Sequence, residues 1–200
     1  MSKSRCLKFG GLCALLLASV GPASAYDAEA GRQLAEQGCA PCHGKGGISE
    51  LPTVPSLAGQ GNDYVVLALY QYRAKHRPSE IMEPLAGPLT DSDLGNLAAY
   101  FSSLKPWTPV RQSSAAALAA GPALALQKNC IQCHNGPGLQ GQQSVPRIAG
   151  QQIEYLTAQL KLFRAGTRGD IDGNMTSAAH DLTDQDVDTL ADYISGLATP

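Results

Sequence analysis

The sequence predicts an all-α protein built as a tandem duplication of one small helical fold. Apolar side chains recur three and four positions apart in both halves, which is the spacing of a helix face. No segment shows the alternating pattern of a strand of any length. Residues of the first half also return in the second half at a nearly constant distance, and a period near 90 residues is far longer than a solenoid unit. We therefore expect two domains rather than a repeat array.

Residues at matching places of the two halves are identical or similar. Matching residues are first 91 positions apart. A two-residue insertion in the second half then raises this distance to 93 positions. At the first offset, Cys39, His43, Pro55, Gly59, Tyr64 and Arg73 return as Cys130, His134, Pro146, Gly150, Tyr155 and Arg164. At the second, Met82, Leu89, Thr90, Leu94, Leu97, Phe101 and Leu104 return as Met175, Leu182, Thr183, Val187, Leu190, Ile194 and Leu197.

These offsets place the expected domains at 26–105 and 115–200, joined by a proline-containing linker over 106–114. The alanine-rich run Ala115–Ala120 could extend that linker or open the next helix. A chain of this length can form one domain or two small ones, and the repeat favours two.

Each half is expected to hold three short helices around long loops. In the first half they cover 27–38, with Leu34 and Ala35 facing inward, then 64–75, with Asn62 as a candidate cap, and a third helix that starts at Thr90. Thr90 and Asp93 form a capping-box-like start with Asp in place of Glu. Pro78, Met82, Pro84 and Pro88 predict an irregular loop before this third helix. The expected inward positions are Tyr64, Leu67, Ala68 and Tyr72 in the second helix, and Leu94, Leu97, Ala98, Phe101 and Leu104 in the third.

The first 25 residues have the pattern of a secretory signal peptide. Three basic residues precede the short apolar run Leu12–Val20, and Ala23-Ser24-Ala25 offers small residues for cleavage before Tyr26. The apolar run is too short to span a bilayer, which disfavours an uncleaved anchor. Cys13 lacks the small-residue context of a lipoprotein cleavage site. We therefore expect an exported, periplasmic protein with no transmembrane span in its mature form.

Removal of this peptide would take away three positive charges and no negative charge, so the formal net charge moves from −2 to −5. An acidic chain without a basic patch disfavours nucleic acid as a partner. It suits docking on a basic protein surface. Peripheral association with a membrane stays open, although no amphipathic anchor is evident.

Two pentapeptides, Cys39-Ala40-Pro41-Cys42-His43 and Cys130-Ile131-Gln132-Cys133-His134, carry the chemistry. This is the attachment pattern of a c-type haem. Positions i, i+3 and i+4 share one helix face, so two thiols can form thioethers with the porphyrin while the histidine binds its iron. A redox disulfide in each motif is disfavoured by the following histidine. A zinc site would need the two motifs to converge. Each domain is thus expected to wrap around one covalently bound haem c.

The fifth iron ligands follow from the motifs as His43 and His134. For the sixth ligands, Met82 and Met175 are the two methionines after residue 25, and they occupy matching places in the repeat. His76 and His180 do not match each other and are expected to be solvated surface residues, with bis-histidine ligation of one haem as the minor alternative. A thioether ligand favours ferrous iron and raises the reduction potential. Two protein ligands also leave no open iron position, so we expect electron exchange rather than catalysis.

Further residues of the repeat could support the haems. The carbonyl oxygens of Pro55 and Pro146 could accept the imidazole N–H of the ligand histidines, or the prolines could simply stiffen a loop. Trp107 has no counterpart and is expected to pack between the domains. Four residues could hydrogen-bond haem propionates or belong to ordinary amphipathic helices: Tyr64, Tyr155, Arg73 and Arg164.

Together these motifs resemble the dihaem cytochromes of the cytochrome c4 family. The resemblance rests on both haem motifs, the segments Pro55–Gln60 and Pro146–Gln151, and the paired methionines, and it covers essentially the whole chain after residue 25. It implies two class I cytochrome c folds related by a pseudo-twofold axis, with axial pairs His43/Met82 and His134/Met175. One departure is the longer loop before Met175, with Asp170 and Asp172, which could make the haem potentials differ.

The resemblance implies electron transfer in the periplasm, commonly from a quinol-oxidising bc complex toward a terminal oxidase. We expect a soluble, monomeric dihaem carrier. The alternative is a bound cytochrome subunit that takes electrons from a flavin-containing or other periplasmic dehydrogenase. A dihaem enzyme such as a peroxidase or a thiosulfate-oxidising dehydrogenase would need a displaceable ligand, and the matched methionines argue against one.

Overall fold

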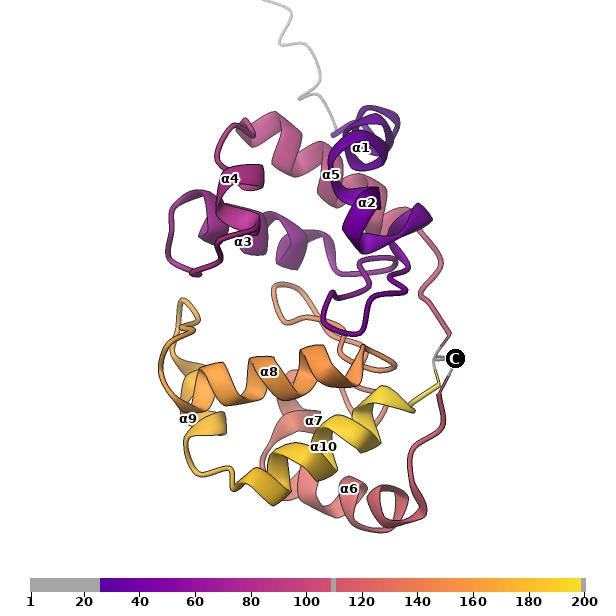
Figure 1. Ribbon diagram of the computed structural model, residues 1–200, viewed down its shortest axis with the longest axis vertical. Helices are drawn as coiled ribbons and strands as arrows, with labels where there is room; N and C mark the ends of the chain where they lie inside the picture. Colours follow the sequence, from indigo (N-terminus) through magenta and orange to yellow (C-terminus); the bar gives the residue numbers. More distant parts are fainter. Residues whose placement is uncertain (1–25, 109–110, 199–200) are drawn as a thin grey trace, which may run out of the picture.

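A computed structural model of the chain describes residues 26–108 and 111–198, and it places the helices in two stacked groups (Figure 1). The expected signal peptide, residues 1–25, lies outside the described residues. The upper group contains α1 (Ala28–Leu34), a π-helical turn (Ala35–Cys39), α2 (Ala40–His43), a 3-10 turn (Lys45–Gly47), α3 (Asn62–Arg73), α4 (Met82–Ala86) and α5 (Asp91–Ser103). The lower group contains α6 (Ala115–Gln127), α7 (Cys130–Cys133), α8 (Ile153–Arg164), α9 (Asn174–His180) and α10 (Asp184–Ser195).

The all-α prediction is confirmed. Within the described ranges, strand-like pairing is limited to an isolated bridge between Gln142 and Val145. The helices of the two groups correspond in order, so that α1 to α5 match α6 to α10. No helix in the described part of the chain is long and apolar enough to cross a membrane.

Each half holds more helices than the three expected. The loop predicted to be irregular contains α4. This helix tolerates Pro84 because the proline lies in its first turn, where a backbone N–H would have no partner within the helix. The alanine-rich run opens α6, which begins after Ser114, whose Oγ accepts the N–H of Ala117 at 3.2 Å. Asn62 was a wrong choice of cap, because α3 begins at Asn62 itself and Gly61 is its N-cap.

The capping prediction for the third helix is correct, and the second half repeats it. At the start of α5, Asp93 N–H donates to Thr90 Oγ1 at 3.1 Å and Thr90 N–H donates to Asp93 Oδ2 at 2.8 Å. At the start of α10, Asp186 N–H donates to Thr183 Oγ1 at 3.1 Å and Thr183 N–H donates to Asp186 Oδ2 at 2.9 Å. Each box satisfies donors that a helix N-terminus leaves free, which fixes where the last helix of each half begins.

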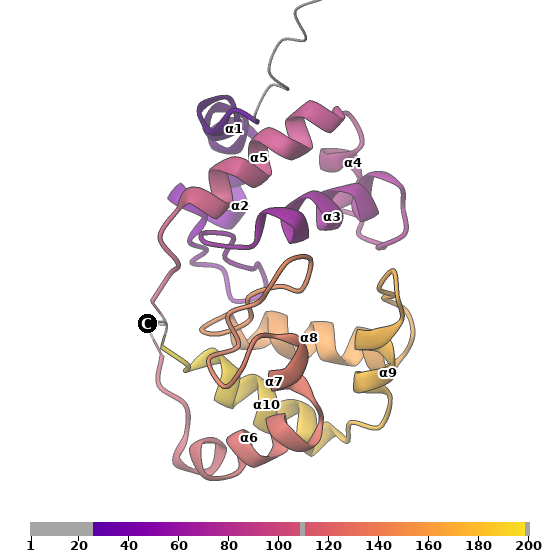
Figure 2. The ribbon, with the colours of Figure 1, turned by 180° about the vertical axis from the view of Figure 1, so that it is seen from behind.

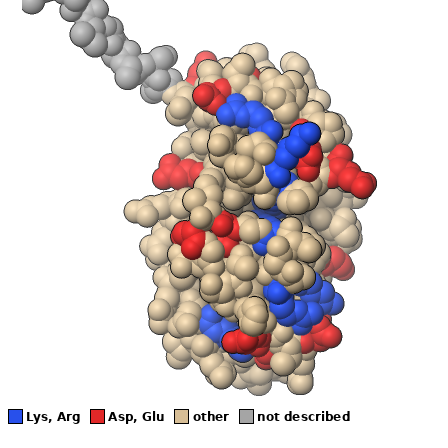
Figure 3. Space-filling view, turned by 90° about the vertical axis from the view of Figure 1, so that its left-hand side faces the viewer, with Lys and Arg blue, Asp and Glu red and all other residues tan. Residues whose placement is uncertain are grey.

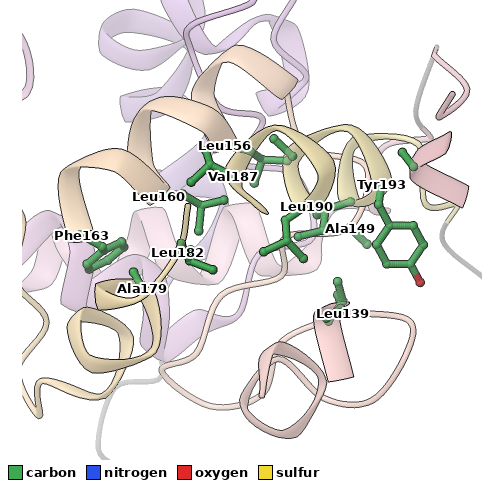
Figure 4. Packing of buried hydrophobic residues seen from close by; sticks show 14 residues of the cluster. Leu139, Ala149, Leu156, Leu160, Phe163, Ala179, Leu182, Val187, Leu190 and Tyr193 are labelled. Atoms are coloured by element: carbon green, nitrogen blue, oxygen red, sulfur yellow. The ribbon is translucent and has the colours of Figure 1, made fainter. Parts of the chain in front are cut away.

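Each half also contains its own hydrophobic cluster. In the first half, α5 packs on α1 and α3, and in the second, α10 packs on α6 and α8 (Figure 2). A side chain at Gly31 would overlap the backbone of Asn96, so glycine is what lets α1 cross α5 closely. Figure 4 shows the second cluster, where Leu156 and Leu160 of α8 lie near Val187 and Leu190 of α10, and Phe163 lies beside Ala179 and Leu182.

The expected inward faces are confirmed for α5 and differ for α3. Leu94, Leu97, Ala98 and Phe101 of α5 are buried and Leu104 is half-buried. In α3 the buried residues are Val65 and Gln71. The expected set of Tyr64, Leu67, Ala68 and Tyr72 is half-buried. Val65 belongs to the cluster against α5, whereas the two tyrosines lie beside charged groups between the halves.

The halves meet through reciprocal contacts, as a pseudo-twofold relation requires. Gln60 pairs with the backbone of Arg147, and its counterpart Gln151 pairs with the backbone of Ser56. Trp107 is buried and donates from Nε1 to the carbonyl oxygen of Gly150 at 2.7 Å, which confirms that it packs between the halves. On the face shown in Figure 3, acidic and basic side chains are interspersed rather than gathered by sign.

Candidate haem sites

The two cysteine and histidine motifs lie in short helical segments. Cys39 ends the π-helical turn after α1, and Cys42 and His43 lie in α2. In the second motif Cys130 and Cys133 begin and end α7, and His134 is its C-cap. One helical turn therefore carries each pair of thiols, with the histidine directly after it. All four described cysteines are free thiols and half-buried or exposed, so they are available for thioether formation.

Both histidines are buried and held in the same way. The His43 ring donates from Nδ1 to the carbonyl oxygen of Pro55 at 2.8 Å, and His134 donates to that of Pro146 at 2.8 Å. The predicted bonds to these carbonyls are thus confirmed. Because Nδ1 carries the proton, Nε2 presents its lone pair to a metal. Burial lowers the pKa of both rings more than the carbonyl bond raises it, so each imidazole is neutral, the form that binds iron.

Met82 and Met175 lie in the first turns of α4 and α9, where both are half-buried. Their backbones are held differently. Met82 N–H donates to Ser79 Oγ at 3.0 Å, whereas Met175 N–H donates to the Asp170 carboxylate at 2.7 Å. Asp170 also accepts the backbone N–H of Thr176 at 3.1 Å. The longer loop of the second half therefore supplies a charged support where the first half uses a hydroxyl.

The competing histidines have the positions expected of surface residues. His76 is exposed and lies beside the ring of Tyr70, with a centroid separation of 6.2 Å. His180 is exposed and pairs with Asp181 at 2.8 Å. Neither is placed in the interior of its half.

Arg73 and Arg164 bond to groups of the protein itself, and their proposed contact with haem propionates stays a prediction. Arg73 donates to the carbonyl oxygen of Leu89 at 2.8 Å and to Asp91 at 2.6 Å. Arg164 forms the matching bonds to Leu182 at 3.0 Å and Asp184 at 2.7 Å. Each arginine thus ties the end of one helix to the start of the last helix, because the acidic first turn of that helix faces the guanidinium.

Sequence reasoning missed three buried arginines between the halves. Arg77, Arg147 and Arg168 are 4%, 2% and 8% exposed, and the ion pairs found among the described residues involve none of them. The guanidinium of Arg77 lies 4.5 Å from the ring centroid of Tyr72, and that of Arg168 lies 4.2 Å from that of Phe163. Tyr72 and Arg77 have Phe163 and Arg168 as counterparts 91 residues later. This repetition was the sequence signal that could have revealed these arginines.

Polar side chains surround these arginines. Arg77 donates to Tyr155 Oη at 2.9 Å and to Gln159 Oε1 at 3.2 Å, and Arg168 also donates to Gln159. Burial alone would raise the pKa of Tyr64, but Arg77 and Arg168 outweigh it and lower that pKa. The cluster therefore holds buried positive charge that favours a negative partner.

Comparison with known proteins places this geometry in a family. A family model described as "Cytochrome c" matches residues 118–198, and one described as "Cytochrome C oxidase, cbb3-type, subunit III" matches residues 26–101. Cytochrome c4 of Thiocapsa roseopersicina is 35% identical over 86% of this chain and 93% of its own. The crystal structure of reduced cytochrome c4 from Pseudomonas stutzeri has a TM-score of 0.77 and 34% identity, over 86% of this chain and 98% of that one.

The chain belongs to the cytochrome c4 family. Its fold is that of two class I cytochrome c units, and each unit binds one haem c covalently. Like its cytochrome c4 relatives, it is a dihaem electron-transfer protein.

Relatives with another description are also similar. A protein described as "Thiosulfate dehydrogenase electron acceptor" from Thiomonas intermedia is 34% identical over 78% of this chain and 77% of its own. The structure of thiosulfate dehydrogenase from Marichromatium purpuratum matches with a TM-score of 0.75 and 33% identity, over 84% of this chain and 40% of that one. That longer chain thus contains a region with this dihaem fold.

The residues of this chain fit the two haems. Free thiols lie one helical turn apart, and each neighbouring imidazole presents Nε2. Arg147 Nε and Arg168 Nε are buried without a hydrogen-bond partner, as expected where a carboxylate-bearing group is to be received. When bound, each haem supplies a one-electron couple. The chain would hold it through the two thiols and would orient the imidazole through the proline carbonyl.

Proposed function

We propose that this protein is a periplasmic electron carrier that passes electrons from a quinol-oxidising bc complex to a terminal oxidase. In this proposal His43 and Met82 are the axial ligands of the first iron, and His134 and Met175 those of the second. Thioether links join the haems to Cys39, Cys42, Cys130 and Cys133. The units span 26–105 and 115–200, with 106–114 as linker, and the protein is a monomer.

The observation that supports this proposal is that both halves place one histidine and one methionine in the same way. Each half orients one buried imidazole through a proline carbonyl and presents one half-buried methionine at the start of a short helix. Two protein ligands per iron would keep the coordination nearly unchanged on reduction. That suits fast electron exchange and excludes a substrate from the iron.

Substitution of the methionines tests the ligand assignment. In the oxidised protein we expect two low-spin haems, each with the near-infrared charge-transfer band of methionine-to-ferric coordination. Met82→Ala and Met175→Ala should each remove about half of this band's intensity and lower the potential of one haem, because the thioether favours ferrous iron. A band that keeps its full intensity in either variant would show that the sixth ligand at that haem is another residue.

A second candidate function is electron acceptance from a periplasmic dehydrogenase. It is favoured by the relatives described as thiosulfate dehydrogenase electron acceptors and by the dihaem region within the Marichromatium enzyme. Gel filtration of native extract separates the two candidates, since a free carrier elutes as a small monomer. Co-elution with a dehydrogenase in a stable complex would favour the second.

A further inference from the structure

The peptide units that orient the two histidines are also the units that join the two halves. The carbonyl of the Pro55–Ser56 peptide accepts from His43 Nδ1 at 2.8 Å. The N–H of this same peptide, on Ser56, donates to Gln151 Oε1 of the other half at 2.8 Å. A continuous chain of two hydrogen bonds through one peptide therefore runs from the first histidine to a side chain of the second half.

The second half repeats this chain in the opposite direction. His134 Nδ1 donates to the carbonyl of the Pro146–Arg147 peptide at 2.8 Å, and the N–H of Arg147 donates to Gln60 Oε1 at 3.0 Å. Each glutamine amide also donates to the next carbonyl oxygen, from Gln60 to Arg147 at 2.7 Å and from Gln151 to Ser56 at 3.0 Å. Both glutamines are almost fully buried, at 4% and 3% exposed, so water does not compete for these bonds.

We propose that Gln60 and Gln151 are positioning residues that tune the haem of the opposite half. This inference rests on the proposed ligation by His43 and His134. An acceptor on the N–H of a peptide polarises that peptide and makes its carbonyl oxygen more negative, because chains of hydrogen bonds strengthen one another. A stronger carbonyl acceptor draws the Nδ1 proton and makes the imidazole a better electron donor to iron. Ferric iron is stabilised, and the potential falls.

The sign of a substitution follows from this chain. Gln151→Leu removes the acceptor from Ser56 N–H with little change in volume, so the Pro55 carbonyl becomes a weaker acceptor. The haem of the Cys39 motif should then shift by about threefold toward ferrous at a fixed solution potential, which is about 28 mV for a one-electron couple. Gln60→Leu should cause the same shift at the haem of the Cys130 motif.

The decisive feature of the test is that the effect crosses between the halves. Redox titrations are followed by NMR, with the haem methyl signals assigned to each motif through neighbouring residues. In Gln151→Leu the haem of the first half should shift while that of the second half stays in place, and Gln60→Leu should show the reverse. Equal shifts of both haems, a shift in the haem of the substituted half, or no shift would overturn the proposal.

Gln152 offers a matched control within the same contact. Its side-chain amide donates across the boundary to the carbonyl oxygen of Ser49 at 2.7 Å and bonds to neither proline peptide, while its backbone N–H, which the substitution keeps, donates to Gln151 Oε1 at 3.0 Å. Gln152→Leu therefore loosens the contact between the halves and should leave both potentials unchanged. If it shifts them as Gln151→Leu does, the effect comes from loosening rather than from the peptide chain, and the proposal is wrong.

Two further measurements test the same proposal if a leucine variant folds poorly. Gln151→Glu retains an acceptor for Ser56 N–H and should not raise the potential of the first haem. The Nδ1–H resonance of His43 in the reduced protein should move upfield in Gln151→Leu, while that of His134 stays in place. The charge-transfer band of the unsubstituted protein reports on the axial ligands separately. An intact band without a crosswise shift would thus refute this inference and leave the proposed ligation standing.

Discussion

At the scale of single residues, two arginines of the first half differ in whether their contacts stay within that half. Arg73 is half-buried and bonds to Leu89 and Asp91 of its own half. Arg77, four residues further, is buried and donates to Tyr155 and Gln159 of the other half. The hydrogen bonds of Arg77 should therefore contribute more to stability than those of Arg73, because a buried charge without partners costs more free energy than a partly exposed one.

We therefore expect Arg77→Met to be more harmful than Arg73→Met. Loss of Arg77 removes two charge-assisted hydrogen bonds and should lower the free energy of unfolding by about 2–3 kcal/mol. Loss of Arg73 removes a partly exposed ion pair and should cost about 1 kcal/mol or less. Denaturant titration of the two variants, followed by circular dichroism, measures both values. Equal costs would contradict the ranking.

At the scale of elements, the start of each last helix depends on a reciprocal pair. Thr90 with Asp93, and Thr183 with Asp186, determine where α5 and α10 begin. The side-chain bond to Thr90 holds the pKa of Asp93 below its usual value, and the backbone bond to Thr183 does so for Asp186. These helices pack on the other long helices of their half, so their caps help to fix the register of each hydrophobic cluster.

These lowered pKa values predict a dependence of stability on pH. A carboxylate whose pKa is lower in the folded state stabilises the protein above its unfolded pKa, near 3.8, and this contribution is lost as pH falls through the folded pKa. Thr90→Ala or Thr183→Ala should cost about 1 kcal/mol at neutral pH. Asp93→Asn should flatten the decline of thermal stability as pH falls below 3.8 toward the lower folded pKa. An unchanged slope would contradict this assignment.

At the scale of the whole molecule, the two halves have separate hydrophobic clusters and a polar contact between them. Leu97 of α5 and Leu190 of α10 occupy equivalent places and are 1% and 0% exposed. The contact between the halves consists mainly of hydrogen bonds from glutamine, arginine and tryptophan side chains. Contacts of this kind orient two units and allow each to unfold on its own.

A cavity in one cluster should thus destabilise one half. Leu190→Ala is expected to lower the free energy of unfolding of the second half by about 2–5 kcal/mol, and Leu97→Ala should do so for the first. Denaturant titrations read at haem-specific NMR signals should then show one early transition, in the second half for Leu190→Ala and in the first for Leu97→Ala. If both halves always unfold together, the contact between them is stronger than its polar character suggests.

Local patterns determined much of this protein. The haem motifs, the matched methionines, the capping box at Thr90 and the repeat offsets depend on spacing over a few residues or on direct identity between the halves. Each is therefore visible in a single chain. The bonds from His43 and His134 to the proline carbonyls could also be predicted, because the interval of twelve residues recurs in both halves.

Only the tertiary structure decided how the halves meet. Several contacts join segments that are far apart in the sequence. They are those of the buried arginines, of Gln60 and Gln151 with the opposite half, and of Arg73 and Arg164 with the start of the last helix. No local period marks such pairs, because a side chain's partner across an interface is set by how two packed bodies are oriented. The sequence by itself determined a duplicated dihaem protein. The packing of one half on the other decided that Gln60 and Gln151 bond to the peptides whose carbonyls hold the histidines of the opposite half.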